Sequence, residues 1–191
     1  MHAFLICTGL VALAEMGDKT QLLALLLAAR YRQPLPILAA ILLATLFNHA
    51  LAAALGSWLA ETLNADILRW ILAASFIAMA GWMLIPDQLD DEEDNIRRWQ
   101  RFGVFGATFV LFFLAEIGDK TQIATVALAA RFDHLIIVLA GTTLGMMLAN
   151  APAVFIGDRL AGRLPITLIH RIAALIFLVV GIGVIAQPYF S

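Results

Sequence analysis

Residues 15–31 read EMGDKTQLLALLLAARY, and residues 116–132 read EIGDKTQIATVALAARF. Each copy places a Glu, an Asp and a Lys within five positions, inside a long apolar run. A charged residue at the centre of a bilayer costs roughly 2.5–3.5 kcal/mol, so six of them would cost on the order of 18 kcal/mol before pairing. A typical domain is stable by only about 5–15 kcal/mol. We therefore expect the six charged groups to neutralise one another, or to bind something that neutralises them.

The composition is that of an integral membrane protein. Of the 191 residues, 62% are hydrophobic and 14% are charged, and the mean hydropathy is +0.92, whereas a soluble domain is about 45–50% apolar and about 25% charged. A single cysteine, Cys7, excludes a disulfide framework and offers no thiolate metal site. The start, Met1-His2-Ala3, lacks a basic segment, so the first apolar run is expected to be a retained helix and not a cleaved signal peptide.

The apolar runs predict an all-α membrane protein with six transmembrane helices. About 20 apolar residues cross a bilayer core, and six runs satisfy this length, approximately residues 3–28, 35–60, 66–85, 102–130, 134–157 and 168–187. Charged clusters and prolines separate the runs, because proline cannot continue a helix. The first and fourth runs are longer than a straight crossing requires. Each is expected either to tilt or to break at the motif glycine, Gly17 or Gly118.

The two halves of the chain repeat each other beyond the motif. With an offset of 101 residues, Leu38 falls on Leu139, Gly56 on Gly157, and Asn48-His49 on Ala149-Asn150. With an offset of 102, Arg69 falls on Arg171 and Pro86 on Pro188. The repeat predicts three domains, a three-helix repeat at 1–86, a charged linker at 87–101 and a second three-helix repeat at 102–191. Since three is odd, the second repeat enters the membrane inverted, an architecture typical of alternating-access transporters.

Arginines indicate the orientation in the membrane. One predicted side carries Arg30, Arg32, Arg97, Arg98, Arg101, Arg159, Arg163 and Arg171, and the other carries only Arg69 and Arg131. The positive-inside rule places the first side in the cytoplasm, with both termini outside and the linker inside, and we expect a location in the inner (plasma) membrane.

The linker contains the acidic run 90–94. It is interpreted either as a solvated connector with a short polar helix or as a segment that collects cations.

The motif predicts a cation site halfway across the membrane. On a continuous helix, Glu15 and Asp18 share one face, and Lys19 lies one turn from Glu15. If the two motifs meet, four carboxylates and two ammonium groups leave a charge of about −2, which one divalent cation or two protons would cancel, because close carboxylates cannot all ionise in a low dielectric. Glu15 and Glu116 are the expected shared ligands and proton carriers, with Asp18 and Asp119 as partners, and Lys19 and Lys120 are expected to bridge the aspartates. Neutral oxygens are expected from Thr20, Gln21, Asn48, Thr121, Gln122 and Asn150.

The expected ligands are rich in oxygen, which suits Ca²⁺, Mg²⁺ or Mn²⁺ better than copper or zinc. His49 is either a hydrogen-bonded packing residue or a nitrogen ligand that would favour Mn²⁺. A simpler interpretation of the whole motif is a pair of buried salt bridges that only lock two helices. Two copies at matched positions of a repeat favour the functional interpretation.

The pattern E-x-G-D-K-T in the first and fourth of six spans resembles the Gdt family of membrane cation/proton antiporters, which includes the Golgi calcium and manganese transporter and a bacterial manganese exporter. The resemblance covers nearly the whole chain. It implies export of a divalent cation, with Mn²⁺ first and Ca²⁺ as the alternative. The family's motif roles would fall on Glu15, Gly17, Asp18, Lys19 and Thr20, and on Glu116, Gly118, Asp119, Lys120 and Thr121.

Two other classes of protein were weighed against an antiporter. An intramembrane hydrolase would need an activated Ser, His or Cys beside the motif and a cluster of arginines to hold a phosphate; no such nucleophile lies beside the motif, and no arginine cluster shares its spans. A passive cation channel gives no reason for buried lysines. We therefore expect a transporter and not an enzyme, whose metal ion is a substrate and not a cofactor. Its partners would be the metal ion, protons and the lipid bilayer, with no nucleic acid, while its oligomeric state is left open.

Overall fold

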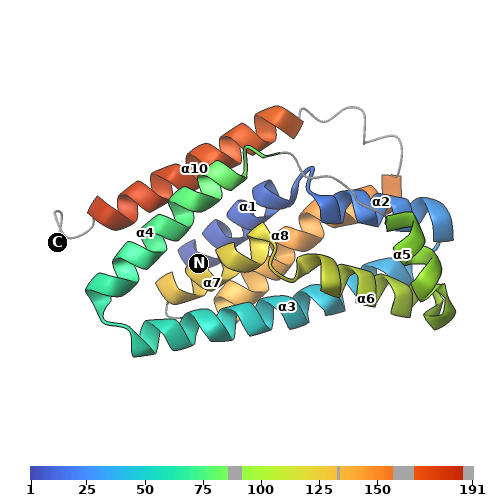
Figure 1. Cartoon of the computed structure of the whole chain (residues 1–191), viewed down its shortest axis with the longest axis horizontal. Coiled ribbons are helices and arrows are strands. Elements are labelled where there is room, and N and C mark those ends of the chain that lie inside the picture. Colours follow the sequence, from blue (N-terminus) through green and yellow to red (C-terminus); the bar gives the residue numbers. More distant parts are fainter. Residues whose placement is uncertain (86–91, 133, 157–165, 187–191) are drawn as a thin grey trace.

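The computed structural model describes residues 1–85, 92–132, 134–156 and 166–186, and every regular element among them is helical. The first half contains α1 (His2–Glu15), α2 (Lys19–Tyr31), α3 (Pro34–Thr62) and α4 (Ala65–Trp82). The linker contributes α5 (Glu92–Trp99) and a short 3₁₀ turn, η1 (Gln100–Phe102). The second half contains α6 (Gly103–Glu116), α7 (Lys120–Arg131), α8 (Leu135–Ile156) and α10 (Ile166–Ala186). Figure 1 shows these helices as an elongated bundle.

The first and fourth predicted spans are broken in the middle of the motif. Gly17 and Gly118 have φ values of +82° and +75°, a left-handed region that glycine enters without a steric penalty. Each helix therefore stops at the motif glutamate and restarts at the motif lysine, and the axes of the second pair meet at 67°. Of the two alternatives expected for these long runs, a tilt or a break at the glycine, the structure shows the break. The continuous ladder of Glu15, Asp18 and Lys19 on one helix face is wrong, because the glycine turns the chain between them.

Local sequence explains where the other helices begin. Pro34 occupies the first turn of α3, where its missing N–H would have no helical partner. Asn64 caps α4, since its side-chain oxygen accepts a hydrogen bond from the Ile67 N–H at 2.8 Å. The predicted short polar helix of the linker is present as α5. The acidic residues 90 and 91, together with Pro86, Gly157, Arg159, Arg163 and Pro188, lie outside the described residues.

The helices of the two halves are interleaved. α1 packs along α8, while α3 packs along α6, α7 and α8. α4 and α10 lie side by side (Figure 1). α4 also contacts α7, and α10 also contacts α1. Two apolar clusters fill the interior, one around Phe76 and Phe177 between α4 and α10, and one around Phe112 on α6. The motif breaks in α1–α2 and α6–α7 lie between these clusters and are held by both halves.

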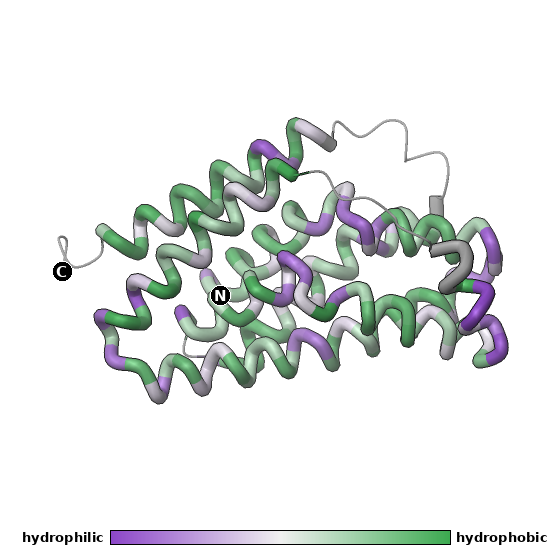
Figure 2. Tube along the Cα trace, in the orientation of Figure 1, coloured by the Kyte–Doolittle hydropathy of each residue, from purple (hydrophilic) through white to green (hydrophobic). Residues whose placement is uncertain are grey.

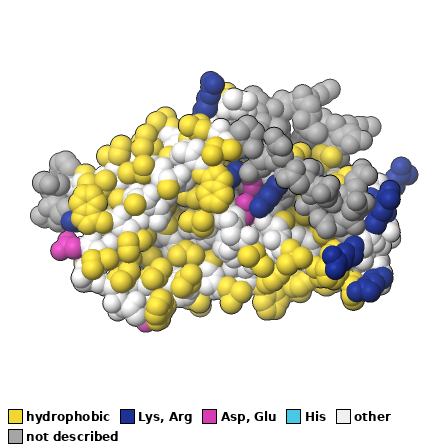
Figure 3. Space-filling view, viewed as in Figure 1, with side chains coloured by type: hydrophobic (Ala, Val, Ile, Leu, Met, Phe, Trp, Pro, Cys, Tyr) yellow, Lys and Arg dark blue, Asp and Glu magenta, His cyan; other side chains and the backbone are white. Residues whose placement is uncertain are grey.

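The outer surface is apolar along most of its length. Large hydrophobic side chains such as Phe47, Trp70 and Phe155 are more than half exposed. Figure 3 shows hydrophobic side chains distributed over much of the described part of the visible face. Four helices are long and apolar enough to cross a bilayer, and a fifth span is obtained if the bent α6–α7 segment counts as one. α1 alone is shorter than a span. These features indicate a membrane protein with four or five candidate spans, whereas six were expected.

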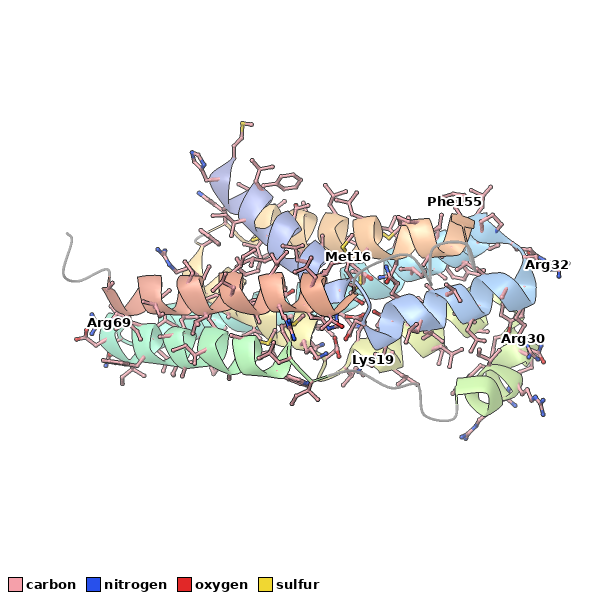
Figure 4. All side chains as sticks on the ribbon, turned by 90° about the horizontal axis from the view of Figure 1, so that it is seen from above. Met16, Lys19, Arg30, Arg32, Arg69 and Phe155 are labelled. Atoms are coloured by element: carbon pink, nitrogen blue, oxygen red, sulfur yellow. The ribbon has the colours of Figure 1, made fainter. Side chains whose placement is uncertain are left out.

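Hydrophilic residues gather at the two ends of the bundle and in a patch between them (Figure 2). Arg69 lies at one end, and Arg30 and Arg32 lie at the other, with Met16 and Lys19 between the two ends (Figure 4). The motif is thus located midway along the long axis, where an embedded protein would meet the centre of the bilayer.

We expect Gly56→Ala to destabilise the protein by about 1–3 kcal/mol, the usual cost of overpacking. A Cβ at this position of α3 would collide with the Val126 carbonyl oxygen and would lie 2.8 Å from the Ala129 Cβ, both on α7. Gly81→Ala on α4 is the matched control, because a Cβ there has no neighbour within 4 Å. Thermal unfolding in detergent measures both variants. Equal melting temperatures would show that the contact between α3 and α7 is not tight.

Candidate cation site

Two ion pairs join the motifs across the two halves of the chain. Lys120 Nζ lies 3.0 Å from Asp18 Oδ1, and Lys19 Nζ lies 3.0 Å from Asp119 Oδ1. Each lysine therefore binds the aspartate of the other motif and not its own. The structure agrees with the expectation that the lysines bridge the aspartates, and it shows that the two motifs meet.

The two ion pairs differ in their exposure. The side chains of Lys120 and Asp18 are both 1% exposed, whereas Lys19 is 32% exposed. Gly118 and Ile117, in the break of the second motif, are also exposed. Figure 3 shows acidic and basic side chains together near the middle of the otherwise apolar face. The site is thus buried on the side of Lys120 and reaches the protein surface on the side of Lys19.

Three carboxylates converge in the interior. One oxygen from each of Glu15, Asp18 and Asp119 lies within 4.8 Å of the other two, and all three residues are buried. Oxygens that share one Ca²⁺ at about 2.3–2.6 Å lie at most about 5 Å apart. The spacing of these three residues, which we call the carboxylate trio, is therefore compatible with one shared divalent cation.

Glu15 is the member of the trio whose carboxylate has the fewest hydrogen bonds and ion pairs to the described residues. It is 0% exposed, and neither of its carboxylate oxygens has a hydrogen-bond partner among the described residues. Asp18 Oδ2 is likewise unpartnered there. Asn150 is the polar side chain placed to hydrogen-bond Glu15, and Glu116, Asp119 and Lys120 act on Glu15 electrostatically. A buried carboxylate with so few partners is costly to keep ionised.

The second motif glutamate, Glu116, lies outside the trio. Its Oε2 accepts a hydrogen bond from Thr121 Oγ1 at 3.2 Å, and the same hydroxyl lies 3.4 Å from Asp119 Oδ2. Thr20, the counterpart of Thr121, makes no such bond in the described part of the chain. The two glutamates were expected to be equivalent shared ligands, but the structure places only Glu15 with both aspartates.

The motif glutamines support the breaks. Gln21 Oε1 accepts from the Gly17 N–H at 2.9 Å, and Gln122 Oε1 accepts from the Gly118 N–H at 2.8 Å. The side-chain amide of Gln21 donates to the Ala149 carbonyl at 2.7 Å. Both glutamines were expected to offer oxygen to a cation. In the structure their oxygens stabilise the turn at the adjacent glycine.

The two predicted asparagines take different positions. Asn48 Nδ2 donates to the Phe113 carbonyl at 3.1 Å, and Asn48 Oδ1 accepts from Gln122 Nε2 at 3.5 Å. Asn150 Nδ2 donates to the Met146 carbonyl at 3.1 Å, which leaves Asn150 Oδ1 without a partner among the described residues. The side chain of Asn48 therefore holds α3 to α6 and α7 through its hydrogen bonds. The side-chain oxygen of Asn150, beside Glu15, could still bind a ligand.

Sequence reasoning missed one residue at the break, His170 on α10. Its Nε2 lies 2.7 Å from the Met16 carbonyl oxygen, in the segment where α1 ends. The contact ties α10 to the first motif. The signal in the sequence was a histidine near the start of an otherwise apolar span, which was not considered.

The ends of four half-helices surround the carboxylates. α1 and α6 end at the motif glutamates, and α2 and α7 begin at the motif lysines. The C-terminal end of a helix carries partial negative charge, which favours cations. Broken helices with ionisable groups at mid-membrane are typical of ion-coupled transporters. Fold and site together define the class, which is a membrane protein with a buried acidic cluster, a candidate cation site, built from two copies of one motif.

Comparisons with known proteins agree with this class. The model of a family described as "Divalent cation/proton antiporter GDT1" matches residues 3–91 and 104–190. A protein of Vibrio cholerae named "Putative manganese exporter" is 56% identical over 184 residues, which cover 96% of this chain and 90% of the relative. The yeast "Divalent cation/proton antiporter GDT1" is 24% identical over 239 residues, covering 99% of this chain and 85% of the yeast protein. No solved structure matches the chain.

The chain belongs to the GDT1 family of divalent cation/proton antiporters. This confirms the resemblance drawn from the motif, and it places the chain among transporters and not enzymes. An antiporter of this family has a divalent cation and protons as its substrates, and its metal is cargo and not a cofactor.

Proposed function

We propose that this protein exports Mn²⁺ from the cytoplasm in exchange for protons, with Ca²⁺ as the alternative substrate of the same mechanism. The cation and the protons compete for one site halfway across the membrane. Glu15, Asp18 and Asp119 bind the cation, and Glu15 and Glu116 carry the protons. Asn150 and Thr20 would add neutral oxygens, because Asn150 Oδ1 and Thr20 Oγ1 are buried and have no hydrogen-bond partner among the described residues.

The observation that carries the proposal is the state of Glu15. Its carboxylate is fully buried and without a hydrogen-bond partner in the described part of the chain, yet it lies in a trio whose oxygens are within 4.8 Å of one another. A residue with only a structural role would be expected to have its oxygens bonded. A cation or a proton would supply what the surrounding residues do not.

Charge balance favours an exchange of one divalent cation for two protons. The two Lys–Asp pairs are each neutral overall. The two motif glutamates remain, and each must be protonated or share a cation to stay in a low dielectric. When both are protonated, the site is neutral. When both release their protons and one divalent cation binds, the site is neutral again, so either load can be carried across the membrane.

Two inverted three-helix repeats would present this site to the two sides in turn. The repeat at an offset of 101 residues supports this arrangement, and so does the exchanged packing, since α1 packs along α8 as α6 packs along α3. The bend in α6–α7 provides the fifth span, and α1 with α2 would provide the sixth. We place the protein in the inner membrane, with residues 87–101 and the ends holding Arg30 and Arg32 in the cytoplasm and with both termini outside.

Mn²⁺ is proposed as the cargo because the relative of 56% identity is named as a manganese exporter. Mn²⁺ is also compatible with a carboxylate-rich ligand set. Oxygen ligands alone suit Ca²⁺ equally well, so the test must include both ions.

The test uses the purified full-length protein in liposomes that contain a pH-sensitive dye. With an acidic lumen, we expect external Mn²⁺ to discharge the proton gradient, and a panel of Mn²⁺, Ca²⁺, Mg²⁺ and Zn²⁺ gives the order of preference. Raising the pH equally on both sides is expected to raise the apparent Mn²⁺ affinity, because binding releases protons; two released protons correspond to up to about 100-fold per pH unit. Mn²⁺ entry that moves no protons would indicate a channel, and an affinity that does not change with pH would contradict competition for one site.

A further inference from the structure

His170 joins the last helix of the chain to the first motif. It lies near the start of α10, is 8% exposed, and has its Nε2 2.7 Å from the Met16 carbonyl oxygen. A carbonyl oxygen can only accept a hydrogen bond, so Nε2 carries the hydrogen and donates it. Figure 4 shows Met16 midway along the bundle, beside the start of α10. A helix of the second half therefore holds a backbone oxygen of the first break.

Met16 stands between two members of the carboxylate trio. It follows Glu15 and precedes Gly17 and Asp18. It is also the extended residue at which α1 ends, with φ −63° and ψ 115°. The last carbonyls of a helix have no partner within that helix. The imidazole binds such an oxygen, and it thereby fixes the plane of the Met16–Gly17 peptide between the two carboxylate residues.

The bonds inside the two breaks are alike. The N–H of each motif aspartate donates to the carbonyl of the motif glutamate, from Asp18 to Glu15 and from Asp119 to Glu116, both at 3.1 Å. The glutamine of each motif binds the N–H of its glycine. These bonds shape both breaks in the same way, and the bond from His170 is an addition at the first.

The repeat counterpart of α10 offers no matching histidine. At the offset of 102 that aligns Arg69 with Arg171, His170 falls on Leu68 of α4, whose side chain has no donor. α10 packs along α1, which leads into the first break, whereas α4 packs along α7, which leaves the second. Ile117, the equivalent of Met16, is 54% exposed. The histidine contact therefore belongs to the first motif, which supplies two of the three carboxylates of the trio.

We infer that His170 is a positioning residue of the cation site, which holds the first break in the shape that brings Glu15 and Asp18 together. It acts through the Met16 carbonyl, as neither a ligand nor a proton carrier. Groups that orient metal ligands from outside typically contribute about 10–100-fold to metal affinity. The neutral Nε2–H tautomer and the imidazolium both donate to a carbonyl, so this role does not depend on the charge of the ring. The inference rests on the proposed function, because it concerns the affinity of that same site.

The transport test measures proton flux in liposomes over a range of Mn²⁺ concentrations for the full-length wild type, His170→Leu and His170→Gln. Leucine cannot donate a hydrogen bond, so we expect the apparent KM for Mn²⁺ to rise on the order of tenfold, with the maximal flux largely kept. Glutamine presents an N–H near the position of Nε2 and is expected to restore most of the affinity. An unchanged KM in His170→Leu would overturn the inference, and so would a His170→Gln variant as weak as His170→Leu.

His170→Asn keeps the amide of His170→Gln but presents it nearer the backbone, at the position of Nδ1. It should therefore lose the bond to Met16 and weaken Mn²⁺ as His170→Leu does, and it serves the test if the leucine variant does not fold. His170→Asn with the affinity of His170→Gln would show that the contact with the Met16 carbonyl is not what matters.

A matched control separates this contact from the general packing of α10. Phe177→Leu, on the same helix, removes a buried ring that stacks on Phe76 of α4. We expect it to lower the melting temperature and to leave the apparent KM for Mn²⁺ unchanged. If KM rises as much as in His170→Leu, loosened packing of α10 explains both results and the inference is overturned.

A second measurement does not depend on flux. Equilibrium binding to purified protein, followed by the EPR signal of free Mn²⁺, is expected to show the same loss of affinity in His170→Leu. The number of protons released per bound Mn²⁺ should stay at the wild-type value, because His170 carries none of them, and a smaller number would contradict a positioning role. Wild-type protein that exchanges no divalent cation for protons would overturn the proposed function instead, so the two failures are distinguishable.

Discussion

Glu15→Gln is expected to abolish divalent-cation-driven proton flux while leaving the protein folded. Glutamine has nearly the same shape but can neither give up a proton nor offer a charged oxygen, so both loads of the site are affected. We expect a loss of about 100-fold or more, since even the removal of an outer partner of a metal ligand typically costs 10–100-fold in affinity. The folded state should not suffer, because a buried carboxylate whose oxygens accept no hydrogen bond from the described residues is replaced by a neutral group.

The measurement is dye-reported proton flux in liposomes, with melting temperature as the check on folding. Glu61→Gln is the matched control, because Glu61 is an exposed glutamate at the end of α3. Glu116→Gln is expected to stop proton exchange as well, but to retain more Mn²⁺ binding than Glu15→Gln, because Glu116 lies outside the carboxylate trio. Flux at the wild-type rate in either motif variant would remove the role proposed for that glutamate.

The second large effect is expected for Lys120→Met, which would leave the buried Asp18 without its ion-pair partner. Breaking a buried pair on one side typically costs about 3–5 kcal/mol, which corresponds to a melting temperature lower by roughly 6–20 °C for a chain of this size. Lys19→Met removes the matching lysine of the other pair, whose distance is the same but whose lysine is 32% exposed. Asp119 itself is 2% exposed, but water can reach the position that Lys19 vacates, so we expect a smaller loss than for Lys120→Met.

A double variant separates stability from transport. Adding Asp18→Asn to Lys120→Met removes the unpaired charge, and the melting temperature should recover most of its loss. Transport should not recover, because the trio has lost a carboxylate. If Lys120→Met and Lys19→Met are equally destabilised, the difference in burial between the two pairs does not control their strength.

Much of the site could be predicted from the repeated motif. Charges inside apolar runs are too costly to stay unpaired, which predicted that the two motifs would meet and that their lysines would pair with aspartates; the same prediction counted Glu116 as a shared ligand, whereas the structure leaves it outside the carboxylate trio. A break at Gly17 and Gly118 was one of two alternatives that the length of these runs offered, the other being a tilt. The family was recognised from these few residues, and the family model that confirms it matches residues 3–91 and 104–190.

Other features depend on the three-dimensional path of the chain and could not be read from the sequence. Lys19 pairs with Asp119, and Lys120 with Asp18, because the folded chain brings the two motifs against each other, and the sequence of either motif does not show which lysine meets which aspartate. The inequality of Glu15 and Glu116 arises because only Glu116 is bonded by the threonine of its motif. Identical sequences gave no sign of this difference.

The crossed ion pairs have a mechanical consequence. Because each lysine is bonded to the opposite half, moving the halves apart at this level would separate two pairs of charges at once, one of them away from water. Away from the motifs, no ion pair among the described residues joins the two halves. We therefore expect the halves to tilt about this level during transport, so that one end of the bundle widens as the other narrows.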